Sequence, residues 1–153
     1  MPSKEEIRKL RKLSQQFAYT SIQMHEAIGR KAGMSGTDHK YLGFLLQQGE
    51  MTAGEFSVIT GLTTGAVTSL IDRFEKKRLV KRQPDKADRR KVIIVPDTEK
   101  ITKLFKPLYE DFQSGTEKQF AAFSSEELKV LERYFINAME MMNHKIDTIN
   151  QKQ

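Results

Sequence analysis

The pattern that most constrains the fold lies between Thr52 and Lys77, where Gly61 separates two short amphipathic segments. The first segment opens with Thr52 and Glu55, the spacing of a capping box at a helix N-terminus. Gly61 permits a tight turn, and Thr63 can cap the second helix. Two short helices joined by such a turn are typical of a helix-turn-helix. The residues predicted to face inward on the second helix are Val67, Leu70, Ile71 and Phe74.

A β-hairpin is predicted directly after the second helix. Residues 79–82 and 91–95 are rich in valine, isoleucine and leucine, and the polar loop between them holds a proline and two aspartates. A hairpin in this position is a wing. The sequence therefore predicts a mainly α chain with a small β-hairpin wing, with the winged helix-turn-helix part at residues 37–95.

A shorter helix is predicted before Thr52, ending near Gln48 because Gly49 follows. Residues 50–51 are predicted to form a short extended link to the next helix. On the helices that flank this link, the residues expected to face inward are Tyr41, Leu42, Leu45, Leu46, Phe56 and Ile59.

Long helices are predicted at both ends of the chain, within residues 3–31 and 98–149. Ser3 and Ser124 are each followed three residues later by a glutamate, so both can form capping boxes. Apolar residues recur at three- and four-residue steps along these segments, and such stripes need a partner surface. Candidate dimer-interface residues are Ile7, Leu10, Leu128, Leu131, Phe135 and Met142.

Positive charge is concentrated in residues 60–95, which hold ten Lys and Arg against four Asp and Glu. Their net charge of +6 equals the net charge of the whole chain, so the remaining residues sum to zero. The sequence pI is about 9.5. An excess of positive charge confined to one helix and one loop indicates a polyanion partner, most simply double-stranded DNA.

Several side chains of this region suit contacts with DNA. A helix in the major groove can offer Thr, Ser and Arg to base edges, lysines can contact phosphates, and a loop-tip arginine can enter a minor groove. The alternative is a solvated basic face. Candidate DNA-binding residues are Thr63, Thr64, Thr68, Ser69, Arg73, Lys76, Lys77, Arg82, Arg89 and Arg90.

Two phrases in this region resemble the MarR family of bacterial transcriptional regulators. Residues 72–82 read DRFEKKRLVKR, similar to the family's D-R-L-E-x-x-G-L-V-x-R, and residues 85–90 read DKADRR, similar to D-x-x-D-x-R. The resemblance implies that Asp88 orders the wing and pairs with Arg73, while an adjacent wing arginine reaches the minor groove. Arg78 stands where the family usually has glycine, so this helix end must be capped differently.

The resemblance also implies the assembly and its regulation. Residues 1–153 would be one protomer of a homodimer, with the segments 3–31 and 98–149 forming the interface. This dimer would bind a pseudo-palindromic operator and act as a repressor. Many members bind a small aromatic or phenolic effector. Ordinary core packing is the favoured alternative for any single residue of such a pocket. Candidate pocket residues are Phe17, Met24, His25, His39 and Leu42.

Other classes of protein are disfavoured. The chain has no cysteine, no phosphate-binding glycine loop and no G-x-S-x-G motif, so we predict that it is not an enzyme and uses no cofactor. No metal site is predicted, because the three histidines lack the spacing of a zinc motif. The N-terminus does not resemble a secretory signal, so a cytoplasmic location is expected. The alternative to a sequence-specific regulator is a helical protein-interaction module or an architectural DNA-binding module without sequence specificity.

Overall fold

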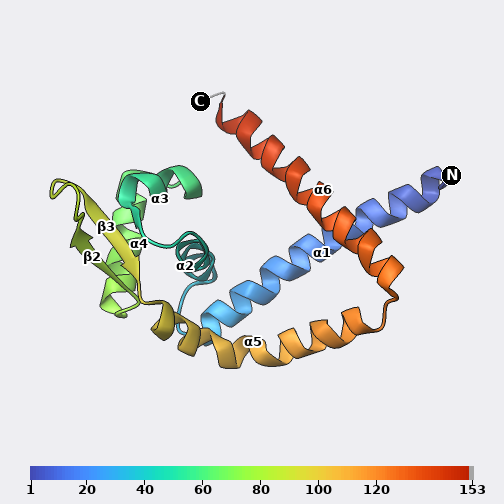
Figure 1. The fold of residues 1–153 in the computed structure, drawn as a ribbon, viewed down its shortest axis with the longest axis horizontal. Helices are drawn as coiled ribbons and strands as arrows, with labels where there is room; N and C mark the ends of the chain where they lie inside the picture. Colours follow the sequence, from blue (N-terminus) through green and yellow to red (C-terminus); the bar gives the residue numbers. More distant parts are fainter. Residues whose placement is uncertain (152–153) are drawn as a thin grey trace. The chain divides into compact units, whose positions relative to one another are not determined.

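The structure is a computed structural model that describes residues 1–151 (Figure 1). The chain forms two compact units, Met1–Leu108 and the part from Tyr109 onward, and one helix crosses the boundary. The described elements are α1 (Lys4–Lys31), α2 (Gly36–Gln48), β1 (Met51–Thr52), α3 (Ala53–Thr60), α4 (Thr64–Lys76), β2 (Val80–Pro84), β3 (Val92–Pro96), α5 (Thr98–Ala121) and α6 (Ser125–Asn150).

The first unit holds a small antiparallel sheet with the strand order β1-β3-β2. β2 and β3 form the predicted hairpin, in which Arg82 lies opposite Ile94. Within the link predicted at residues 50–51, Met51 is extended as expected, but it also pairs with Ile94 and begins a third strand, which was not predicted. A segment this short gives no alternating pattern, and its pairing depends on the distant β3. The mainly helical fold with a small wing is confirmed.

The core of the first unit lies where α2, α3 and α4 meet the sheet. The inward stripe predicted on α4 is buried, as are Leu42, Leu45 and Phe56. Leu46 and Ile59 were predicted to face inward, but they are 36% and 45% exposed. Successive helix residues are rotated by about 100°, so Leu46 lies beside the buried face of α2. Ile59 lies in the last turn of α3, beyond the part of that helix that buries Phe56.

Local capping signals place the helix N-termini. The three predicted capping boxes are all formed, with Ser3, Thr52 and Ser124 as the N-cap residues. α5 begins at Thr98, and the Asp97 carboxylate accepts a hydrogen bond from the backbone N–H of Lys100 at 3.0 Å. These caps satisfy amides that the helices themselves leave without a partner.

α1 and α2 approach closely at two glycines. A Cβ atom on Gly36 would lie 2.6 Å from Cγ of Glu26, and one on Gly29 would lie 2.8 Å from Cβ of His39. Side chains at these positions would therefore force the helices apart. This contact fixes the first turn of α2, which carries Asp38 and His39.

The second unit contains the end of α5 and all of α6. No residue of α6 is buried, although many are apolar. Its large exposed apolar residues are Val130, Tyr134, Phe135, Ile136, Met139, Met141, Met142, Ile146 and Ile149. In the described part of the chain, no helix combines the length and the hydropathy that a membrane span requires.

Candidate nucleic-acid interface

α4 presents a polar face opposite its buried stripe. The hydroxyl of Thr63 caps the helix by accepting a hydrogen bond from the backbone N–H of Ala66 at 3.2 Å. Thr64, Thr68 and Ser69 are exposed in the first half of the helix. The N-terminal half of a recognition helix is the part that usually reaches base edges. These residues are therefore exposed where a major groove would be read.

Arg73 is bound within the protein. Its Nε and Nη2 donate hydrogen bonds to the two carboxylate oxygens of Asp38, at 2.8 and 2.9 Å. The pair expected between Arg73 and Asp88 is thus replaced by a pair with a residue of α2. The hydrogen bonds from Arg73 lower the pKa of the Asp38 carboxyl, against the opposing effect of burial. The pairing of Asp38 with Arg73 was not predicted from the sequence. There, Asp38 is only an acidic residue three positions after Ser35, in the first turn of a helix.

Arg82 on β2 is also engaged internally. Its guanidinium lies 2.7 Å from a carboxylate oxygen of Asp72 and 2.6 Å from one of Glu75. Both acids are on α4, so Arg82 joins the wing to the recognition helix. The two arginines of this region that carry internal ion pairs are therefore Arg73 and Arg82, whereas Lys76, Lys77, Arg89 and Arg90 are exposed.

The tip of the wing is ordered by short polar contacts. The Asp88 carboxylate accepts a hydrogen bond from the backbone N–H of Arg90 at 3.0 Å, and Asp85 accepts one from that of Ala87 at 2.8 Å. The backbone carbonyl of Lys91 accepts a hydrogen bond from the Asp85 N–H, and the Lys91 N–H donates one to the Asp88 carbonyl. These bonds hold the loop in one conformation and leave the side chains of Arg89 and Arg90 exposed.

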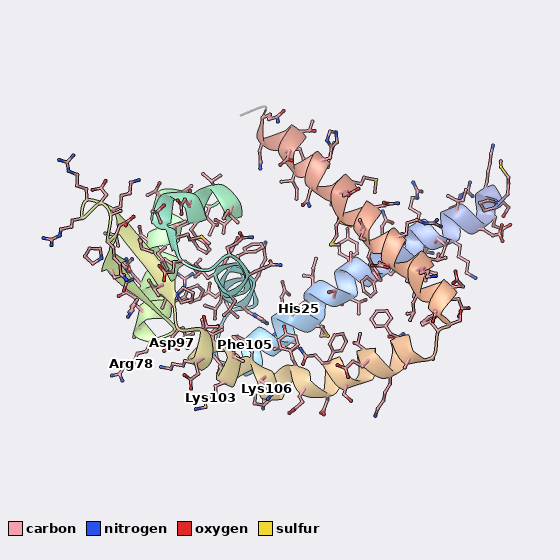
Figure 2. The ribbon with its side chains drawn as sticks, in the orientation of Figure 1. His25, Arg78, Asp97, Lys103, Phe105 and Lys106 are labelled. Carbon is pink, nitrogen blue, oxygen red and sulfur yellow. The ribbon has the colours of Figure 1, made fainter. Side chains whose placement is uncertain are left out.

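The helix end at Arg78 is closed without glycine (Figure 2). Arg78 adopts a left-handed conformation with φ of 58°. Its N–H bonds to the Glu75 carbonyl at 2.8 Å, and the Leu79 N–H bonds to the Phe74 carbonyl at 3.0 Å. This is the hydrogen-bond pattern of a Schellman motif, in which glycine usually occupies the left-handed position. The sequence predicted a different cap at this helix end. Only the residue type differs, because Arg78 replaces glycine in an ordinary Schellman turn.

The candidate pocket residues occupy different environments. Phe17 is 68% exposed, whereas Leu42 is part of the core. His25 and His39 lie edge to face with ring centroids 6.0 Å apart, and His39 stacks on Phe105 at 4.4 Å. Phe105 was not predicted as a neighbour of these histidines; it is on α5, distant in sequence from both (Figure 2). Met24 is half-buried on the same helix as His25.

The depression that the structure shows does not include the candidate pocket residues. This open depression of about 490 Å³ lies at the C-terminal end of α4 and the adjoining ends of β2 and β3. Its charged lining residues are Glu75, Arg78, Lys81 and Asp97, whose charges balance. Across residues 1–151, no group of three or more His, Cys, Asp or Glu side chains is placed to hold a metal ion.

Comparison with known proteins identifies the family. Residues 32–91 match the sequence pattern of the MarR family. Over 134 residues the chain is 37% identical to YcgE of Bacillus subtilis (strain 168), described as an uncharacterized HTH-type transcriptional regulator. That alignment covers 86% of this chain and 84% of YcgE. The chain belongs to the MarR family.

Solved structures share the MarR fold. A MarR family protein from Bacillus stearothermophilus has a TM-score of 0.72 at 26% identity, covering 94% of this chain and 99% of its own. A mutant MarR from E. coli, complexed with operator DNA, has a TM-score of 0.59 at 19% identity, covering 90% of this chain and 99% of its own. As a MarR family member, the chain is a non-enzymatic, DNA-binding transcriptional regulator of the HTH type.

Proposed function

We propose that this MarR family protein acts as a homodimeric repressor on a pseudo-palindromic operator. In each protomer, α4 would read the major groove through Thr63, Thr64, Thr68 and Ser69. The observation that carries the proposal is the exposure of these four residues together with that of Arg89 and Arg90 at the wing tip. The protein would act in the cytoplasm, because that is where its DNA target would lie.

The wing and the end of α4 would supply the electrostatic contacts. Arg89 and Arg90 are exposed on a loop that Asp88 orders, which suits insertion of a guanidinium into a narrow minor groove. Lys76 and Lys77 are exposed at the end of α4, where they would contact phosphates. The operator complex of an E. coli MarR mutant supports this use of the fold.

Dimerisation through the terminal segments, 3–31 and 98–149, would cover apolar surface that the single chain leaves exposed. On α1 the large exposed residues include Ile7, Leu10 and Leu13, and on α6 they include Phe135 and Met142. Leu128 and Leu131 are half-buried on α6. Exposed apolar surface on this scale usually marks an interface. A symmetric dimer would also present two recognition helices to two half-sites.

A small aromatic effector would then release the operator. Support comes from the aromatic cluster of His25, His39 and Phe105, which joins α1, α2 and α5. Stacking against these rings would suit a planar ligand. Because α2 also contacts the recognition helix through Asp38, a ligand there could favour one arrangement of the winged part over another.

Selection of bound duplexes from a random DNA pool tests the operator proposal. We expect an inverted repeat with half-site centres about one helical turn, or roughly 10 base pairs, apart. Arg90→Ala should weaken binding to the enriched duplex by about 1–3 kcal/mol. Strong salt dependence without an enriched sequence would indicate an architectural protein, and absence of DNA binding would indicate a protein-interaction module.

Light scattering tests the dimer. The wild-type chain should have twice the protomer mass, and Phe135→Glu should shift it toward the monomer because a buried charge without a partner is costly. Glu140→Gln, on the same helix at an exposed position, is the matched control. A wild-type monomer at micromolar concentration would contradict the proposed assembly.

A further inference from the structure

The contact between Asp38 and Arg73 joins α2 to α4 through two residues that are 35 positions apart in the chain. Asp38 is in the first turn of α2, where Ser35 caps the helix and its hydroxyl accepts the Asp38 N–H at 3.1 Å. Arg73 is in the last turn of α4, the recognition helix. Two parallel hydrogen bonds fix both the distance and the orientation of a guanidinium relative to a carboxylate.

The pair is asymmetric in its exposure. The Asp38 side chain is 12% exposed, whereas the Arg73 side chain is 53% exposed. If Arg73 turned away to contact DNA, a largely buried carboxylate would lose its hydrogen-bonded partner. Such a loss is costly, because the remaining charge stays desolvated. The structure therefore favours Arg73 remaining on Asp38 when the protein binds DNA.

Arg73 also lies away from the part of α4 that would contact DNA bases. About two and a half turns of α4 precede it, and the exposed Thr and Ser side chains near the N-terminus of α4 are closer to the part that usually meets base edges. Its charge is balanced by Asp38, so it adds little to the attraction of phosphates. What the pair can do is hold the C-terminal end of α4 against α2.

We propose that Asp38 is a positioning residue for DNA binding, which acts by clamping the recognition helix through Arg73. The C-terminal end of α4 is packed into the core by Ile71 and Phe74, and Arg82 ties it to the wing. The clamp adds a hydrogen-bonded contact with α2. It tethers α4 to the turn of α2 that packs against α1 at Gly36.

Asp38→Asn gives a test in which simple electrostatics and the clamp predict opposite signs. Removing an acid from a DNA-binding protein should strengthen its attraction to DNA. The clamp predicts instead that affinity for the duplex enriched by the wild type falls about tenfold, a typical coupling for residues in direct contact. Affinity for a scrambled duplex of equal length should not fall, and the salt dependence should stay the same.

Substitutions of Arg73 separate a clamp from a phosphate contact. Arg73→Lys keeps the charge but loses the bidentate geometry, so the clamp predicts the same loss as in Asp38→Asn. Arg73→Gln combined with Asp38→Asn should be no weaker than Arg73→Gln alone. Lys76→Ala is the control: it should weaken binding to both duplexes and reduce the salt slope by about 1.

Three results would overturn the clamp. One is tighter or unchanged binding of the Asp38→Asn variant to the operator. This includes the result that the variant loses thermal stability but binds the operator as the wild type does. Another is wild-type affinity in Arg73→Lys together with a reduced salt slope in Arg73→Gln. The third comes from hydrogen exchange without DNA, which does not depend on finding an operator. There, Asp38→Asn should speed exchange in the last turns of α4 about tenfold but leave α6 unchanged, and equal exchange in α4 would refute the clamp.

Discussion

The imidazole of His39 stacks on the ring of Phe105, with centroids 4.4 Å apart and planes inclined by 19°. His39 belongs to the first turn of α2 and Phe105 to α5, and the imidazoles of His39 and of His25 on α1 lie edge to face. Burial lowers the pKa of His39, and the nearby His25 lowers it further against an opposing hydrogen bond to its own backbone. Three helices therefore meet at a group that is better accommodated in its neutral form.

Stability should depend on pH through His39. Its pKa in the folded state is below the ordinary value of 6.5, so the unfolded chain binds more protons in this range. The free energy of unfolding should fall as pH drops through 6.5, and this loss should stop below the folded-state pKa. Urea unfolding between pH 7.5 and 5 would measure it. His39→Gln should flatten the dependence and His144→Gln should not; an equal slope in His39→Gln would contradict the assignment.

Arg78 is in a backbone conformation that costs free energy for any residue with a Cβ atom. Its φ of 58° closes α4, and the side chain is exposed. Arg78→Gly should raise the free energy of unfolding by about 0.5–1 kcal/mol, because relief of the left-handed strain exceeds the added entropy of the unfolded chain.

Thermal or urea unfolding of Arg78→Gly gives the measurement. Lys77→Gly is the matched control, because Lys77 has a right-handed conformation with φ of −85° and gains nothing from glycine. We expect that control to be destabilised. A loss of stability in Arg78→Gly would mean that the arginine side chain makes a larger contribution than the strain.

Local parts of this fold could be predicted from the sequence because their causes are local. The three capping boxes, the turn at Gly61 and the buried stripe of α4 each follow from residues within a few positions of one another. The hairpin follows from two apolar runs around a polar loop. The same reasoning found the exposed hydroxyl groups of Thr64 and Ser69.

Contacts between distant segments could not be predicted in this way. Asp38 looks like a helix-capping residue until the fold brings Arg73 to it. The family resemblance suggested Asp88 as the partner of Arg73, but Asp88 instead accepts a backbone hydrogen bond within the wing. The stacking of Phe105 on His39 and the pairing of β1 with β3 were missed for the same reason, since both depend on elements far apart in the chain.

The close approach of α1 and α2 predicts opposite effects for two glycines of one helix. Gly36→Ala should lower the free energy of unfolding by about 1–3 kcal/mol, because its Cβ would lie 2.8 Å from the Cα of Glu26 on α1. Gly43→Ala should raise it by about 0.5–1 kcal/mol, since a Cβ there meets nothing within 4 Å and alanine favours helix. Urea unfolding of both variants tests the pair, and equal effects would contradict the packing.

Arg82 should stabilise the protein in a salt-dependent way. It bridges β2 to Asp72 and Glu75 of α4, but its side chain is 34% exposed and solvent screens the attraction. Arg82→Gln should therefore cost less than about 1 kcal/mol at low salt, and still less at high salt, because counterions weaken exposed ion pairs. Urea unfolding at two salt concentrations measures this change.

Lys81→Gln provides the matched control for Arg82, since Lys81 is the preceding residue of β2 and has no ion pair among residues 1–151. Its stability should match that of the wild type at both salt concentrations. Arg82→Gln should also leave the wing less firmly attached, so its affinity for the operator should fall without a unit change in the salt slope. A reduction of the slope by about 1 would instead show that Arg82 leaves its carboxylate partners to contact a phosphate.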